Sequence, residues 1–388
     1  MKNQKKIIPL SVPFFFGKEK SNVNRCIKST FVSTFGNYLE EFTTKIKKIT
    51  KSQYAVPMVN CTSALQIAIK LLNPKNNDEV MVPTITFVSS INSIIYNNCR
   101  PIFFGVDKNF LLDINLLIKF LNENTFQKKG YCYNKNTNNR ILALMAVHAF
   151  GNSVDLNQKL LKILKAKNIK LIEDAAESLG SYYFQKTKKI HTGLIGDLGC
   201  ISFNGNKIIT SGGGGMIVTN SKRFAEKALY LSTQAKDDAM NFVHNEVGYN
   251  FRMSNLHASI GCAQIGNLKK ILSKKKKIFQ IYLKEISQIN GLKMIEPPAN
   301  SISNHWMNVM VIDKHKYSLS KSKLIKKFKE NKIEVRAVWH PNHLQKPFTK
   351  YEKYFANNNL DLIKNSLCLP GSYSLSTKDQ SKIIKILK

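Results

Sequence analysis

The sequence contains few acidic residues and very few arginines. Of its 388 residues, 25 are Asp or Glu and 59 are Lys or Arg, which gives a formal net charge of +34. Only six of the basic residues are arginines, at positions 25, 100, 140, 223, 252 and 336. Recognition of nucleic acids favours clustered charge and the planar fork of Arg. Because the lysines are instead spread along the chain, we interpret the charge as a compositional bias and expect no nucleic-acid partner.

Paired cysteines and long apolar runs are also lacking. The seven cysteines form no C-x-x-C pair and have no metal-type spacing, so we expect a reducing compartment and no metal site. No run approaches the roughly 18 apolar residues of a membrane span. The apolar stretch 7–17 is interrupted by Pro9 and Pro13, and no small-residue cleavage site follows it. We therefore expect a cytoplasmic protein without a signal peptide or a membrane partner.

Short β-branched runs alternate with helical patterns over the first 250 residues. The predicted strands are 55–60, 80–83, 101–106, 141–148, 170–172, 199–203 and 216–219, with helices at 63–72 and 87–96. Such alternation predicts an α/β fold with a mainly parallel sheet. The Lys-, Asn- and Gln-rich stretch 127–140 is predicted to be an exposed loop.

The pattern changes near residue 253. Ser254 is a plausible N-cap for one long helix that continues towards Gly291. Apolar segments at 307–312 and 333–339 then predict a smaller α+β unit. We expect a large α/β domain at 1–253 and a small C-terminal domain at 254–388.

The segment 170–220 is the richest in chemistry. Its first strand ends in Glu173-Asp174-Ala175-Ala176-Glu177, at the edge where open α/β sheets bind ligands. Lys207 follows the next strand, 33 positions after Asp174, and precedes the glycine run 212–215. A lysine that forms an imine and a carboxylate that keeps a pyridine nitrogen protonated are what a pyridoxal phosphate (PLP) enzyme requires. This pair predicts PLP chemistry.

A phosphate seat is predicted upstream. Asn60-Cys61-Thr62-Ser63 is a strand-to-helix turn, where free N–H groups and the helix dipole favour an anion. Phe87 begins the next helical stretch and offers a ring to a planar cofactor.

The sequence resembles the DegT/DnrJ/EryC1/StrS family of PLP-dependent sugar aminotransferases, which have the type I aspartate aminotransferase fold. The resemblance spans essentially the whole chain, from Ile8 to Pro370. The matching stretches are 60–65, 83–89, 147–151, 173–180, 196–207, 212–219 and 248–255. The resemblance implies an aminotransferase that uses PLP, is a homodimer with shared active sites, and takes an amino group from L-glutamate.

The resemblance also implies residue roles. Lys207 matches the Schiff-base lysine, Asp174 the partner of the pyridine nitrogen, and Glu177 the residue near the phenolic oxygen, where most relatives carry Gln. The other cofactor residues that it implies are Cys61, Thr62, Ser63, Phe87, Ser202, Asn204 and, from a neighbouring subunit, Asn250. Cys61 stands where Gly is usual, so a positive φ at this position would be strained.

A narrower resemblance concerns the substrate. Segments 232–238 and 244–250, with Lys236, are similar to the branch that acts on UDP-linked 4-keto-6-deoxy-N-acetylhexosamines in bacillosamine-type and legionaminic-type pathways. Amination at a 3-keto carbon is the alternative. Because Arg is rare here, Arg252 and Arg336 are candidate contacts for a phosphate or carboxylate. His343 is a weaker candidate for substrate contact.

Other interpretations remain open at this point. Asp174 and Glu177 could merely cap a helix, and the glycine run could be only a flexible turn. Arg252 and Arg336 could form structural ion pairs, and His148 is more typical of a satisfied strand-end histidine than of an acid–base group. A PLP-dependent sugar dehydratase is a rival within the fold, but such relatives replace the lysine with His. A regulator that is not an enzyme is the other rival.

Overall fold

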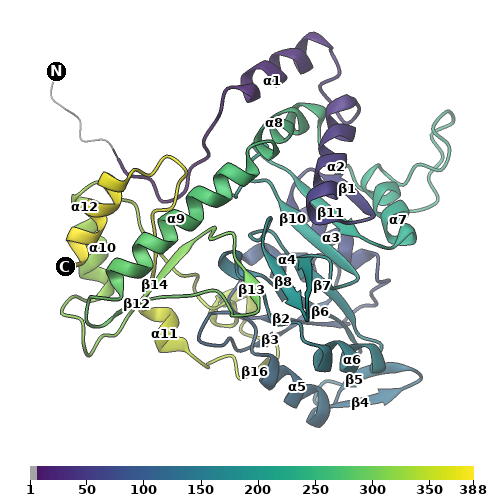
Figure 1. Ribbon diagram of the computed structural model, residues 1–388. Coiled ribbons are helices and arrows are strands. Elements are labelled where there is room, and N and C mark those ends of the chain that lie inside the picture. The colour runs from purple at the N-terminus through teal and green to yellow at the C-terminus, as the bar shows by residue number, and fades with distance from the viewer. Residues whose placement is uncertain (1–6) are drawn as a thin grey trace.

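The computed structural model describes residues 7–388 and shows a large sheet flanked by helices, with a second, smaller sheet near the C-terminus (Figure 1). The α-helices are α1 (Lys18–Lys28), α2 (Asn37–Thr50), α3 (Cys61–Lys70), α4 (Val88–Ile95), α5 (Ile114–Glu123), α6 (Gln158–Ala166), α7 (Lys222–Ser232), α8 (Asn255–Ile265), α9 (Leu268–Ile286), α10 (Lys321–Glu330), α11 (Leu360–Lys364) and α12 (Thr377–Leu387).

The strands alternate with these helices in the first part of the chain. They are β1 (Tyr54–Met58), β2 (Glu79–Pro83), β3 (Arg100–Phe104), β4 (Thr125–Lys128), β5 (Tyr131–Asn134), β6 (Ile141–Val147), β7 (Lys170–Asp174), β8 (Tyr182–Gln185), β9 (Lys188–His191), β10 (Leu198–Ser202), β11 (Gly215–Thr219), β12 (Leu292–Met294), β13 (Ser301–Ile302), β14 (Asn308–Ile312), β15 (Arg336–Ala337), β16 (Lys353–Tyr354) and β17 (Ser366–Leu369). Short 3-10 helices lie at Ala149–Gly151, Asn342–Leu344 and Lys346–Phe348.

The large sheet has the strand order β1-β11-β10-β7-β6-β2-β3-β16. Its pairs from β10 to β16 are parallel, whereas β11 is antiparallel to both β10 and β1. Strands β2, β6, β10 and β11 are buried along their whole length, as expected for a sheet covered on both faces. The predicted α/β fold with a mainly parallel sheet is confirmed.

A second sheet, β12-β14-β17-β15, is antiparallel and packs with α9, α10 and α12 around its own hydrophobic core. The two-residue strand β16 belongs to the C-terminal part of the chain by sequence, but it pairs with β3 at the edge of the large sheet. The division at residue 253 into two domains stays a prediction.

Two details differ from the sequence-based expectation. The helix that begins after the N-cap Ser254 is divided into α8 and α9 by Gly266 and Asn267. The break falls at Gly266 because glycine is the poorest helix former after proline. The stretch 127–140 is not only a loop, because β4 and β5 pair as a hairpin across it.

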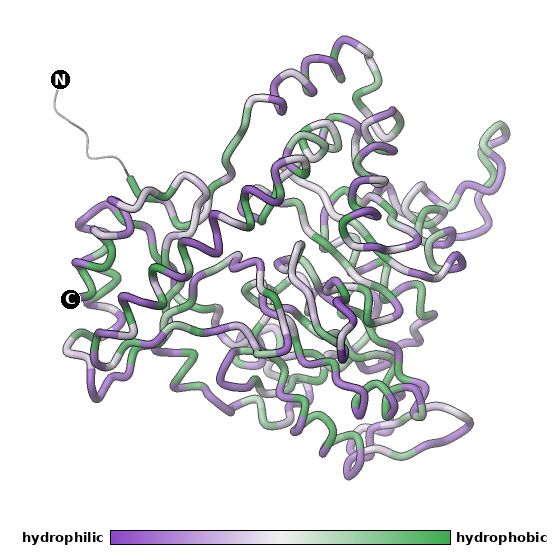
Figure 2. Tube along the Cα trace, viewed as in Figure 1, coloured by the Kyte–Doolittle hydropathy of each residue, from purple (hydrophilic) through white to green (hydrophobic). Residues whose placement is uncertain are grey.

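Buried and exposed positions alternate along α9, which matches its alternating hydropathy (Figure 2).

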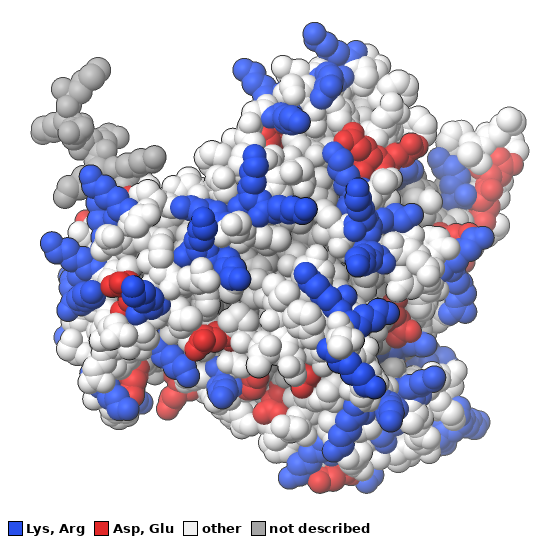
Figure 3. Space-filling model, in the orientation of Figure 1, with Lys and Arg blue, Asp and Glu red and all other residues white. Residues whose placement is uncertain are grey.

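The basic side chains are distributed over the visible face of the molecule and do not gather in one patch (Figure 3). All seven cysteines are buried and free. Among residues 7–388, no helix has the length and apolar character needed to cross a membrane.

Candidate active site

A cavity of about 280 Å³ lies where the parallel strands of the large sheet end. Thr86 and Phe87 follow β2, Phe150 follows β6, Asp174 ends β7 and Ser202 ends β10, and all five line the cavity. Side chains that are distant in sequence meet here because parallel strands deliver their carboxyl ends to one edge of the sheet.

Asp174 is buried at the base of the cavity. Its Oδ2 accepts a hydrogen bond from the Ser90 hydroxyl at 2.7 Å, and its Oδ1 accepts one from the Ala176 amide at 3.1 Å. Burial raises the pKa of this carboxyl, while the Ser90 bond, the Ala176 bond and the charge of Lys207 oppose the rise. The site thus supplies hydrogen-bond donors that favour an ionised Asp174.

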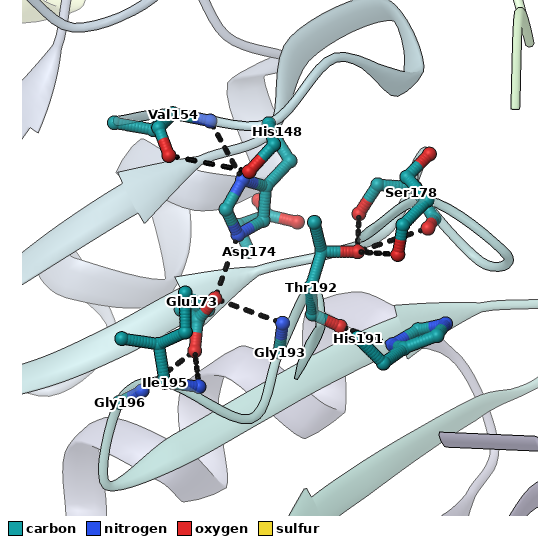
Figure 4. A network of polar contacts seen from close by, with 12 residues as sticks. His148, Val154, Glu173, Asp174, Ser178, His191, Thr192, Gly193, Ile195 and Gly196 are labelled. Carbon is teal, nitrogen blue, oxygen red and sulfur yellow. Dashed lines mark hydrogen bonds and ion pairs between the residues drawn. The ribbon is translucent and has the colours of Figure 1, made fainter. Parts of the chain in front are cut away.

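A largely buried network supports the strand end that carries Asp174 (Figure 4). Glu173, on the opposite side of β7, accepts hydrogen bonds from the amides of Gly193, Ile195 and Gly196 and contacts His148 Nε2 at 2.8 Å. Burial alone would raise the pKa of Glu173, but the hydrogen bonds from His148 and from the Gly193 and Gly196 amides outweigh it, so the pKa is lowered. This geometry agrees with the interpretation of His148 as a satisfied strand-end histidine.

The amine of Lys207 reaches the same cavity from the loop after β10. Its Nζ lies 3.2 Å from Glu177 Oε1 and 4.1 Å from the centre of the Trp306 ring. Glu177 Oε2 also accepts the Phe150 amide at 2.8 Å. Lys207 and Glu177 are both largely buried, and burial raises the pKa of Glu177 while Lys207 opposes that rise.

The predicted phosphate seat is the start of α3. Cys61 and Thr62 are the first two residues of this helix and line the cavity. Amides in the first turn have no carbonyl partner within the helix, so they are available to an anion. The Ser63 amide differs because it already donates to the side chain of the N-cap Asn60 at 2.8 Å. Cys61 does not adopt a positive φ, so its replacement of Gly causes no backbone strain.

The glycine run passes close to this helix start. A Cβ on Gly215 would lie 2.6 Å from the backbone carbonyl of Asn60, so β11 can begin beside α3 only with glycine there. Gly213 and Gly214 line the cavity. Gly215 is therefore required by backbone packing, and the run is more than a flexible turn.

The opposite wall of the cavity comes from the C-terminal part of the chain. Trp306, Met307, Arg336 and Trp339 line it. The Trp306 Nε1 donates to the Asn206 carbonyl at 2.7 Å, which fixes the ring beside Lys207. Trp339 stacks on Phe150 with ring centres 4.6 Å apart. Apart from Arg336, these residues were missed as site residues by sequence reasoning, since no local motif connects them with Lys207.

Ser90 was also missed. It lies one turn after Phe87 on α4, and its hydroxyl reaches Asp174 only because β2 and β7 end at the same edge of the sheet. A serine at this helical spacing from the stacking aromatic residue was the one available signal.

Most of the predicted cofactor residues meet at the cavity. Those that line it are Cys61, Thr62, Phe87, Asp174, Glu177, Ser202, Asn204 and Lys207. Phe87 is 55% exposed, so the face of its ring is accessible.

Four other predicted residues lie elsewhere in the single chain. His343 is buried and bonds the Thr84 hydroxyl at 2.5 Å and Asn357 at 3.0 Å, so this geometry gives no support to a substrate contact. Arg252 lines a separate surface groove beside α2 and α7. Lys236 and Asn250 belong to the exposed loop 233–250 that follows α7.

Comparison with known proteins identifies the family. The model of the DegT/DnrJ/EryC1/StrS aminotransferase family matches residues 16–388. The chain belongs to this family. It is a PLP-dependent aminotransferase, and the resemblance, the fold and the cofactor predicted from the sequence are confirmed.

Individual relatives match over nearly the whole chain. GDP-perosamine synthase of Escherichia coli O157:H7 is 33% identical over 96% of this chain and 95% of its own length. The dTDP-4-amino-4,6-dideoxy-D-glucose transaminase of Shigella dysenteriae is 26% identical over 85% of this chain and 83% of its own. Among solved structures, Helicobacter pylori PseC, an aminotransferase involved in the biosynthesis of pseudoaminic acid, has the same fold, with a TM-score of 0.86, 19% identity and 98% coverage of both chains.

Proposed function

We propose that this aminotransferase moves the amino group of L-glutamate to the 4-keto carbon of a nucleotide-linked 4-keto-6-deoxyhexose, for the synthesis of a glycan or surface polysaccharide. A UDP-linked N-acetylhexosamine is our first candidate, on the resemblance of segments 232–238 and 244–250. A GDP-linked sugar is the second candidate, because the relative that is 33% identical is named GDP-perosamine synthase. Amination at C4 is supported by the name of the Shigella relative, which specifies a 4-amino sugar.

The observation that carries the proposal is the meeting of Lys207, Asp174 and the start of α3 at one cavity. These groups fit the three recognisable parts of the cofactor. Lys207 presents an amine for its aldehyde, Asp174 a carboxylate for its ring nitrogen, and the first amides of α3, with the Ser202 hydroxyl, a seat for its phosphate. Phe87 offers an exposed ring at the cavity edge.

Bound PLP supplies an electron sink for the carbanion formed at the amino-bearing carbon. Lys207 would hold the cofactor and would be the group that moves the proton, since it lines the cavity and carries an amine. Glu177 and the Trp306 ring both contact this amine. Asp174 would stabilise a positive charge on the ring nitrogen of the bound cofactor, and its burial would strengthen that interaction.

Arg336 and the aromatic pair Phe150 and Trp339 are the proposed substrate wall. Arg336 lines the cavity, and its guanidinium is a planar donor of the kind that suits the carboxylate of glutamate or a phosphate of the nucleotide. The dehydratase alternative is disfavoured by the presence of a lysine at position 207.

We further propose a homodimer in which Asn250 completes the neighbouring site. The loop 233–250 exposes large apolar side chains, including Met240 at 86% and Val247 at 84%, and such exposure is typical of an interface. Mixing two inactive variants, Lys207→Ala and Asn250→Ala, tests this arrangement. Activity regained in the mixture supports shared sites, whereas sites confined to one subunit would give no recovery.

The function is tested with purified protein, PLP and L-glutamate against UDP-, GDP- and dTDP-linked 4-keto-6-deoxy sugars, followed by mass spectrometry of the amino-sugar product. The wild type is expected to show the visible absorbance of lysine-bound cofactor, to lose it with glutamate and to regain it with the correct sugar. Lys207→Ala is expected to abolish both the absorbance and turnover. A fully active Lys207→Ala variant would overturn the assignment.

A further inference from the structure

Two buried hydroxyls form a chain that ends on Asp174. Thr86 Oγ1 lies 2.7 Å from Ser90 Oγ, and Ser90 Oγ lies 2.7 Å from Asp174 Oδ2. Ser90 is fully buried and Thr86 is 2% exposed, so water does not compete for these bonds. Both hydroxyls come from the segment that also carries Phe87.

The direction of the chain follows from the charge of Asp174. An ionised carboxylate only accepts hydrogen bonds, so the single Ser90 proton points to Oδ2. In the 2.7 Å bond between the two hydroxyls Thr86 is then the donor, and the Phe87 carbonyl, at 3.3 Å, is the more distant acceptor for the same proton. In this arrangement Thr86 donates to Ser90, and Ser90 donates to Asp174. The bond that Ser90 accepts from Thr86 polarises the Ser90 hydroxyl and makes it a stronger donor.

The backbone that carries these two hydroxyls is fixed by Asn342, a residue that does not line the cavity. Thr86 precedes α4, and its carbonyl accepts a hydrogen bond from Asn342 Nδ2 at 2.8 Å, which also binds the Thr84 carbonyl at 3.1 Å. Asn342 is fully buried. The segment that follows Trp339 in the cavity wall therefore fixes the backbone on which both hydroxyls depend.

We propose that Ser90, supported by Thr86, is a positioning residue of the reaction, whose hydroxyl holds Asp174 ionised and oriented for the ring nitrogen of the cofactor. The inference rests on the proposed role of Asp174 and adds a residue to it. Its physical basis is that a buried carboxylate without donors takes up a proton, and the Ala176 amide alone serves only Oδ1. Ser90 is the side chain that serves Oδ2.

The test compares Ser90→Ala with Ser93→Ala as a matched control. Ser93 is on the same helix and equally buried, but its hydroxyl donates to the Ser90 backbone carbonyl at 2.8 Å rather than to Asp174. Each protein is loaded with PLP labelled with nitrogen-15 at the ring, and the resonance of that nitrogen is recorded without substrate. The dissociation constant of PLP is measured in parallel.

Ser90→Ala is expected to move the resonance towards that of an unprotonated pyridine and to weaken PLP binding about tenfold, the effect of losing one hydrogen bond to a charged group. Ser93→Ala should leave the resonance unchanged, and Ser90→Thr, which keeps the hydroxyl, should retain the wild-type value. Thr86→Val should give a smaller shift in the same direction. An unshifted resonance in Ser90→Ala overturns the inference, as does an equal shift in Ser93→Ala.

Asp174→Asn separates this inference from the function on which it rests. If Asp174→Asn shifts the resonance and Ser90→Ala does not, only the role of Ser90 fails. If Asp174→Asn leaves the resonance at its wild-type position, the assignment of Asp174 itself fails.

Discussion

The amine of Lys207 lies 3.2 Å from a carboxylate oxygen of Glu177, and both side chains are largely buried. Removing one member of such a pair leaves an uncompensated charge, which costs more than the pair itself contributes. In Lys207→Met the carboxylate of Glu177 would stay buried with only the Phe150 amide as a donor. We expect the unfolding free energy of the cofactor-free protein to fall by about 3 kcal/mol near neutral pH.

The pH dependence of this loss has a defined sign. Burial raises the pKa of Glu177, and in the wild type the charge of Lys207 opposes this rise. In Lys207→Met that opposing charge is gone. The folded chain then binds the Glu177 proton more tightly than the unfolded chain does. The destabilisation is therefore absent below about pH 4, near the unperturbed pKa of Glu, and grows as pH rises above it. Urea unfolding at fixed protein concentration measures it.

The double variant Lys207→Met with Glu177→Gln is the control. It removes both charges and keeps an acceptor for the Phe150 amide, so most of the lost stability should return and the pH dependence should disappear. A double variant no more stable than Lys207→Met would contradict the coupling of the two residues.

The network beneath Asp174 gives a second prediction. His148 Nδ1 accepts the Val154 amide at 3.1 Å, so a neutral ring carries its proton on Nε2 and donates to Glu173. In Glu173→Gln one acceptor oxygen becomes an NH₂ group and faces N–H donors. We expect the unfolding free energy to fall by about 1–3 kcal/mol because buried donors lose their acceptor.

The matched control for this network is His148→Gln. Its amide can accept from Val154 through the oxygen and donate to Glu173 through the nitrogen, which reproduces the pattern of the histidine. Thermal unfolding of cofactor-free protein should show a smaller loss than in Glu173→Gln. Equal losses in both variants would show that ring packing, rather than the direction of the hydrogen bonds, stabilises the network.

Local sequence was sufficient to predict that Asp174 and Lys207 meet at one cavity, but not what surrounds them. Asp174 and Lys207 each follow a β-branched strand, and parallel strands deliver their ends to one edge, so the pairing could be inferred. Trp306 and Trp339 lie in irregular segments next to strands of the second sheet, and tertiary contacts bring these segments to the cavity. No periodicity in the sequence reports such contacts, so the wall of the site could not be predicted.

The same limit explains the difference in the helix after Ser254. The apolar spacing from Leu256 to Leu272 predicts one helix, and the local signs of a break are its two glycines, of which Gly261 stays inside α8 and Gly266 follows its last residue. A single glycine is often tolerated inside a helix, at a cost of about 1 kcal/mol, so the sequence alone favoured continuity. The cap Ser254, in contrast, depends on its own hydroxyl and on the His257 amide, and it was predicted correctly.

The close approach of β11 to α3 gives a third prediction. Gly215→Ala would place a Cβ 2.6 Å from the Asn60 carbonyl, in backbone that cannot move without shifting the start of α3. We expect a loss of about 1–3 kcal/mol in unfolding free energy and weaker PLP binding. Gly205→Ala is the control, because nothing lies within 4 Å of its Cβ position. Equal stability of the two variants by urea unfolding would contradict the packing argument.

The buried lysine of α9 gives a fourth prediction, in which the substitution is expected to raise the unfolding free energy rather than lower it. Lys275 is 4% exposed, and its Nζ donates to the Trp306 carbonyl at 3.3 Å. Burial lowers the pKa of Lys275 from its usual value of 10.5 to about 8. The folded chain therefore loses this proton more readily than the unfolded chain. Below about pH 8 both states carry the charge and the folded state bears its full burial cost.

Lys275→Met should remove that cost. We expect the variant to be more stable than the wild type by about 1–3 kcal/mol at pH 7, given that one pKa unit corresponds to about 1.4 kcal/mol. The advantage should shrink as pH rises from 8 towards 10.5, because the wild-type lysine is then neutral in the folded chain. Lys276→Met, at the exposed neighbouring position, should show no such dependence. A gain that stays constant over this pH range would mean that Lys275 costs stability through packing and not through its charge.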